Sequence, residues 1–344
     1  MGMKTIPIQR YMGCFLLLLG VAVACCAADA PASAPAAASA PVEAAVPESN
    51  SAGAPTTNPA GMAAGMRKYI AGQYVLYTDL SEDEAKAALD RLTAMGEMYR
   101  RFVPDLNGAE HGRMPVYLYR RFEDYRRSLG GDERPNAGRY DGLVLRAVLD
   151  AETFSLPGVW RVIQHEGWHQ YSHRILQRIA PPPLWLEEGL AEYFGAAVWK
   201  DGTLQPGHVD AGAYVQRDKT IVLQPGRLQR IQTRIQAEQF RPLEKLATMK
   251  LDGWLRQTNA LNHDQVWSFV HFLLHADDGQ RRKALQSYLA DVLHNPPKES
   301  KRLDLFRFYF GGDLHKLQEE YEAWWLAQPT PVAGEAVLPR DKNS

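Results

Sequence analysis

Alternating and helical patterns of apolar residues divide the chain into a strand-containing part and a later helical part. Residues 73–78 (QYVLYT), 115–119 (PVYLY) and 143–149 (LVLRAVL) have the β-branched and aromatic composition of strands. After the first of them, residues 81–84 (SEDE) match a capping box, which opens a helix with apolar residues at helical spacing up to about Phe102. The pattern predicts a small α/β lobe with a mixed sheet.

Two more helices are predicted after the third strand. Ser155 is a suitable cap for a helix at 157–179 that has proline in its first turn. The proline run 181–183 ends this helix, and the next one is expected at 184–198. We expect a polar loop from there to about residue 240.

The last third of the chain repeats the i, i+3, i+4, i+7 spacing of a buried helix face. This spacing occurs in residues 266–274, 285–293 and 314–324. The predicted fold class is therefore α+β, with an α/β lobe at 67–200 and a mainly helical lobe at 201–328.

The N-terminal residues 1–28 are typical of a secretion signal. Two cations precede the apolar run 12–24, which is shorter than the about 20 residues that a membrane span needs. Lipidation at Cys25 or Cys26 is the alternative, although the residues before them form a poor lipobox. We therefore predict an exported bacterial protein, periplasmic or attached to the cell envelope, with no membrane span after cleavage.

Composition limits the classes of partner and of metal site. Residues 29–66 are mainly Ala, Pro, Ser and Gly and cannot bury enough apolar surface to offset the entropy of ordering, so they are predicted to be a disordered linker. We expect the same of the tail at 329–344. The formal net charge of −1 gives no basic excess for nucleic acid. All 3 cysteines lie before residue 27, so any later metal site must use His and carboxylate ligands.

Residues 165–169 (HEGWH) match HExxH inside a predicted helix. His165 and His169 lie one turn apart on one helix face, so both can bind one metal ion. Glu166 is one step round the helix, where it can act as general base on a water at the open coordination position.

The following helix supplies the third ligand. Within residues 185–194 (WLEEGLAEYF), Glu188 follows the motif after eighteen intervening residues, and Gly189 permits close helix approach. Glu192 lies one turn further and can accept a hydrogen bond from the free ring nitrogen of a ligand histidine. A purely solvated helix face fits less well, because large apolar residues are interleaved with these carboxylates. The set predicts a zinc site.

These motifs resemble those of the gluzincin metallopeptidases. HExxH followed after eighteen residues by Glu within W-L-x-E-G-x-A-E-Y is similar to the aminopeptidase-N-like branch. Residues 69–325 more closely resemble the bacterial peptidase-MA-like family, an exported group, whose later Q-x-W-x-F-V-H-F-L helix matches residues 265–273. The resemblance implies a gluzincin-like fold and zinc on the two histidines and Glu188, with Glu166 as base. The G-x-M-E-N segment of aminopeptidases is absent, so endopeptidase or other amide hydrolase activity is equally expected.

Two further roles remain open. A donor for the oxyanion of the tetrahedral intermediate is needed, and His263 and Tyr214 are the candidates, each weighed against an ordinary packing or surface role. The strand at 143–149 could pair with an extended peptide if it lies at the sheet edge.

The sequence thus predicts an exported zinc metallopeptidase that acts on a peptide or protein substrate. The alternatives are a non-catalytic, zinc-stabilised binding or scaffold protein of the cell envelope, and a hydrolase of cell-wall amides.

Overall fold

The computed structural model describes residues 65–103, 113–131, 136–176, 182–210, 212–217, 220–255 and 259–329. They fall into two compact units: the first draws on 1–97, 109–174 and 201–203, and the second on 98–108, 175–200 and 204–344. The predicted signal peptide and, except for residues 65 and 66, the predicted linker lie outside the described residues, as does the predicted tail after residue 329. No described helix is both long and apolar enough to cross a membrane.

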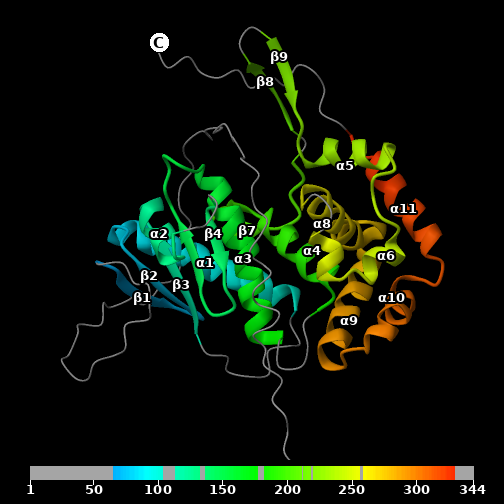
Figure 1. Ribbon diagram of the computed structural model, residues 1–344, viewed down its shortest axis with the longest axis horizontal. Coiled ribbons are helices and arrows are strands. Elements are labelled where there is room, and N and C mark those ends of the chain that lie inside the picture. Colours follow the sequence, from blue (N-terminus) through cyan, green and yellow to red (C-terminus); the bar gives the residue numbers. More distant parts are fainter. Residues whose placement is uncertain are drawn as a thin grey trace, which may run out of the picture. The chain divides into compact units, whose positions relative to one another are not determined.

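The first unit contains a five-stranded sheet with the order β1-β2-β3-β5-β4 (Figure 1). Its strands are β1 (Arg67–Ala71), β2 (Tyr74–Thr78), β3 (Met114–Tyr119), β4 (Gly138–Tyr140) and β5 (Leu145–Val148). β2, β3 and β5 run parallel, whereas β1 and β4 are antiparallel to their neighbours. The sheet is therefore mixed, and the α+β class is confirmed. All three predicted strands are present, while β1 and β4 were not predicted.

The helices around this sheet are α1 (Glu82–Phe102), α2 (Phe122–Ser128) and α3 (Leu156–Leu176). The predicted capping box is confirmed, because the Ser81 amide donates to Glu84 Oε2 at 2.8 Å and the Glu84 amide donates to Ser81 Oγ at 3.4 Å. Ser155 caps α3 as predicted by accepting from the Gly158 amide at 3.3 Å. These caps satisfy amides that a helix start leaves without partners.

Side-chain contacts hold α3, the helix with HExxH, against α1 and β3. The Arg91 guanidinium lies 4.4 Å from the centre of the Trp160 ring and donates to Gln164 at 3.2 Å. Gln170 donates to the carbonyl of Pro115 at 2.8 Å. The motif therefore lies on a helix that is fixed on two sides.

The strand predicted at 143–149 does not lie at the sheet edge. β5 starts at Leu145 and pairs with β3 on one side and β4 on the other, so it has no edge for an extended peptide. Within the described residues β4 is the outermost strand on this side. The condition for peptide pairing by 143–149 is therefore not met, because β4, a short strand before it in the sequence, pairs on its outer side.

The remaining helices and strands follow α3 along the chain. They are α4 (Leu184–Gly195), β6 (Val198–Lys200), β7 (Thr203–Gln205), β8 (Ala213–Arg217), β9 (Thr220–Gln224), α5 (Arg227–Gln236), α6 (Leu243–Ala247), α7 (Leu251–Leu255), α8 (Asn259–His275), α9 (Gln280–His294), α10 (Arg302–Phe310) and α11 (Leu314–Leu326). The polar loop expected up to residue 240 is wrong, because this stretch contains most of β6 together with β7, β8, β9 and α5. Leu228, Ile231 and Ile235 are buried at i, i+3 and i+7 of α5, a pattern that its polar residues obscure.

Aromatic packing forms the core of the second unit. Trp185 of α4 is buried, with ring contacts to Phe269 of α8, Tyr288 of α9 and Phe306 of α10 at centroid distances of 5.5, 5.8 and 5.5 Å. These contacts fix the start of α4, which carries Glu188 one turn later.

The last helix is also tied to this core. Trp325 of α11 donates to the carbonyl of Ser268 at 3.0 Å, and Tyr321 shares a 2.5 Å hydrogen bond with the Ser268 hydroxyl. Gln232 of α5 donates to the carbonyls of Trp325 and Gln328 at 3.1 and 2.9 Å. The end of α11 is therefore held by both α5 and α8.

Gly189 lets α4 and α8 approach closely, as its position beside Glu188 suggested. A Cβ at this position would lie 2.6 Å from Val270 Cγ2 and 2.9 Å from the carbonyl oxygen of Val266. We expect Gly189→Ala to lower the free energy of unfolding by about 1–3 kcal/mol, because the backbone of α8 would have to move. Urea unfolding measures this. Gly253→Ala is the control, since its Cβ would meet its nearest atom at 3.7 Å; equal losses in both variants would contradict the prediction.

Candidate metal centre

His165 and His169 lie together on α3, one helical turn apart. Both side chains are buried, and their Nε2 atoms are 3.1 Å apart. Their rings meet edge to face with centroids 4.8 Å apart. Two ring nitrogens at this separation can both reach one metal ion.

Glu188 of α4 joins the two histidines in a buried group that could hold a metal ion. One potential ligand atom from each of the three residues lies within 4.8 Å of those of the other two. Two imidazole nitrogens and one carboxylate oxygen are the ligands that zinc takes in catalytic sites, where bond lengths are about 2.0–2.2 Å. The donor set and its spacing therefore fit a divalent metal ion.

Glu166, the predicted base, is partly buried on the turn of α3 that carries His165. Its Oε2 accepts a hydrogen bond of 2.9 Å from the backbone amide of Tyr140, in the edge strand β4. The carboxylate thus has a fixed backbone donor. Sequence reasoning missed Tyr140, because the contact joins a three-residue strand to a helix 26 residues later.

His263 lies near the start of α8 and is held by Glu192 of α4. Its Nδ1 atom is 3.1 Å from Glu192 Oε1, and its ring meets Trp254 edge to face at 5.1 Å. Burial lowers the pKa of His263, but the hydrogen bond to Glu192 and the charges of Glu192 and Glu188 outweigh it, so the pKa is raised. The imidazole therefore stays cationic to a higher pH than usual.

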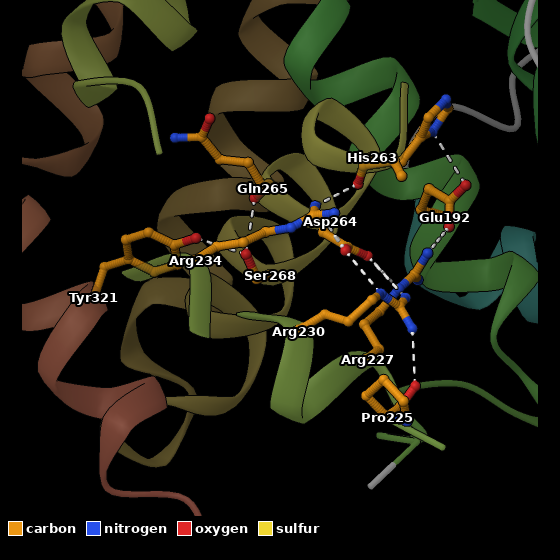
Figure 2. A network of polar contacts seen from close by, with 11 residues as sticks. Glu192, Pro225, Arg227, Arg230, Arg234, His263, Asp264, Gln265, Ser268 and Tyr321 are labelled. Atoms are coloured by element: carbon orange, nitrogen blue, oxygen red, sulfur yellow. Dashed lines mark hydrogen bonds and ion pairs between the residues drawn. The ribbon is translucent and has the colours of Figure 1, made fainter. Parts of the chain in front are cut away.

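Glu192 was predicted to orient a ligand histidine, and its described partners in the second unit are His263 and Arg227. Arg227 of α5 pairs with Glu192 Oε2 and, through Nε, with Asp264 Oδ1 at 3.2 Å. Figure 2 shows Glu192 between His263 and Arg227. The carboxylate is thus fixed on two sides by cationic groups.

Asp264 is the centre of a buried ion network that sequence reasoning missed (Figure 2). Besides Arg227, it binds Arg230 at 3.0 Å and Arg234 at 2.8 Å. The three arginines are spaced i, i+3 and i+7 along one face of α5, which is the signal that could have indicated a common partner. The network fixes α5 on α8 beside His263.

Tyr214, the other oxyanion candidate, lies on β8 opposite Leu223 of β9 in a two-stranded ribbon (Figure 1). Its side chain lies outside the described residues. Its catalytic role stays a prediction.

The comparisons with known proteins concern the same part of the chain. No curated protein matches it. A family model described as "Protein of unknown function (DUF1570)" matches residues 160–299. This segment includes HExxH, Glu188 and His263, so the chain is similar to that family over the part that carries the candidate metal centre.

Proposed function

We propose that this protein is an exported zinc metallopeptidase with a gluzincin-like site. The observation that carries the proposal is the buried group of His165, His169 and Glu188, beside which a carboxylate, Glu166, is held on the same helix. A structural zinc site usually has a fourth protein ligand, and its role in stability requires no general base.

The proposed reaction is hydrolysis of a peptide bond by water. A bound zinc supplies Lewis acidity to this chemistry. Glu166 takes a proton from the attacking water as its oxygen bonds to the carbonyl carbon. The same carboxyl group then passes the proton to the amide nitrogen as the C–N bond breaks.

His263 is the proposed donor to the developing oxyanion, with Tyr214 as the second candidate. Glu192 holds the His263 ring and favours its cationic form. A positioned donor of this kind contributes roughly 3–4 kcal/mol to transition-state stabilisation in studied enzymes. Glu192 would then act on the reaction through His263.

Export belongs to the proposal and rests on the N-terminal sequence, with a lipid anchor at Cys25 or Cys26 as a variant of it. The proposed substrate is a peptide or protein, and we propose no nucleic-acid partner and no membrane span in the mature chain. A cell-wall amide is a further substrate to test.

We expect the purified chain to bind one zinc ion per molecule and to lose it when a ligand is removed. His169→Ala and Glu188→Ala should each lower zinc affinity by more than the roughly 10–100-fold that loss of an outer-shell partner costs. Metal analysis after dialysis measures this. His294→Ala is the matched control, because His294 is exposed on α9, and it should keep its zinc.

Activity is tested on the same preparations. A mixed peptide library should be cleaved by the zinc-restored chain and left intact by the metal-depleted chain. Zinc binding without cleavage of peptides, proteins or cell-wall fragments would favour the non-catalytic scaffold. Failure to bind zinc would overturn the assignment.

A further inference from the structure

Tyr140 connects the proposed base to a second position on the same helix. Its backbone amide donates to Glu166 Oε2 at 2.9 Å, and its hydroxyl lies 2.5 Å from His173 Nδ1. Glu166 and His173 are seven residues apart on α3, which is about two turns and a rise of about 10 Å on one helix face. One tyrosine lying along the helix therefore reaches both positions.

The hydrogen-bond directions at the hydroxyl follow from its single proton. Tyr140 donates to the carbonyl of Gly142 at 2.7 Å, because a carbonyl can only accept. His173 Nδ1 must then donate its N–H to the Tyr140 oxygen, which fixes this ring nitrogen as protonated. The ring of Tyr140 is thus held between α3 and the turn after β4.

That turn is itself well anchored. Asp141 Oδ1 accepts from the amides of Leu143 and Val144 at 3.0 and 2.9 Å, and its other oxygen pairs with Arg146 of β5. Gly142 therefore offers its carbonyl from a fixed position.

The pairing of β4 explains why the Tyr140 amide is available to Glu166. Hydrogen bonds from Val148 to Ala137 and from Asp141 to Val144, of 3.0 and 3.3 Å, mark the pairs that bond to β5. Bonded pairs occur at every second residue of an antiparallel strand, so residues 137, 139 and 141 bond to β5. Tyr140 falls at a position that does not bond, and its N–H therefore faces away from β5. The hydrogen-bond donor to Glu166 is therefore a backbone amide on the outer side of β4.

We propose that Tyr140 is a positioning residue for Glu166 and that the hydroxyl contacts with His173 and Gly142 hold its amide in place. This inference rests on the proposed function, because Glu166 needs an exact direction only if it transfers protons. Loss of the hydroxyl leaves the carboxylate intact but its donor less well fixed.

The kinetic test uses Tyr140→Phe, with kcat and KM measured separately. We expect kcat to fall about tenfold, within the range for loss of outer-shell partners, while KM and zinc content stay unchanged. Tyr125→Phe is the matched control, because it removes a hydroxyl of α2 that bonds Asn136 at 2.5 Å in the same unit. A kcat for Tyr140→Phe equal to that of Tyr125→Phe, or a change in KM alone, would overturn the proposal.

His173 variants separate positioning from general damage. His173→Leu should reproduce the loss, whereas His173→Asn, which keeps a donor near the Nδ1 position, should recover most of it. Because the two side chains act as one unit, Tyr140→Phe combined with His173→Leu should be no worse than either change alone. Additive losses would contradict a shared role.

Hydrogen exchange tests the contact between the Tyr140 amide and Glu166 without any measurement of peptidase activity. Hydrogen exchange of the residue-140 amide should be slow in the wild type and faster in Glu166→Ala and Tyr140→Phe. Faster exchange in both would support the contact even if no peptide is cleaved, in which case the proposed function alone would fail. Unchanged exchange in both variants would overturn the positioning role.

Discussion

Replacing Glu166 with glutamine is expected to reduce kcat for peptide hydrolysis by about 10²–10⁴-fold, the range that a positioned general base contributes. Glutamine has nearly the same shape and keeps an oxygen that can accept from the Tyr140 amide. It cannot take up a proton from water. The two histidines of the candidate metal centre are unchanged, so zinc content should stay at the wild-type value.

The measurement is kcat on a peptide substrate together with metal analysis of the same sample. Glu123→Gln is the control, because this glutamate is exposed on α2 and makes a weak 4.0 Å pair with Arg121. It should leave kcat and zinc unchanged. Equal hydrolysis by Glu166→Gln and the wild type would remove Glu166 from the mechanism.

Asp264→Asn is expected to lower the free energy of unfolding by about 3–5 kcal/mol. The carboxylate of Asp264 is buried and pairs with Arg227, Arg230 and Arg234 of α5. Asparagine keeps the size of the side chain but removes its charge, so the three guanidinium groups lose their common counter-charge, and that of Arg227 is buried.

Urea unfolding followed by circular dichroism measures the loss. Asp304→Asn is the matched control, because it makes the same change at an exposed aspartate that pairs with Lys301 at 2.9 Å. Surface pairs of this kind contribute at most about 1 kcal/mol. If both variants lost equal stability, the buried network would not be what holds α5 on α8.

Features that depend on neighbouring residues were predictable from the sequence. The capping box of Ser81 and Glu84 is confirmed, because both of its hydrogen bonds span three residues. The pairing of His165 with His169 likewise follows from one helical turn. Glu188 could be named as the third member of the group because the proline run ends the first helix and the next helix begins directly after it.

Features that depend on distant residues were not predictable. β4 is only three residues long, so nothing in its composition indicates that it adds outside β5. The Arg227–Asp264 pair joins residues that are 37 apart in the sequence. We expected a loop in place of α5, the helix that carries Arg227, because glutamine and arginine separate its few apolar residues. Pairing order and ion pairs of this kind are decided by tertiary packing.

The contacts of α11 with α5 and α8 decide which fragments of the chain can fold by themselves. Residues 160–299 leave out α10 and α11. In a fragment of that length, the indole of Trp185 would be exposed on the side that contacts Phe306. Ser268 would lose its hydrogen bonds with Tyr321 and Trp325. Expression of that segment alone should therefore yield an aggregating polypeptide, and a soluble fragment that keeps the candidate metal centre has to extend through Gln328.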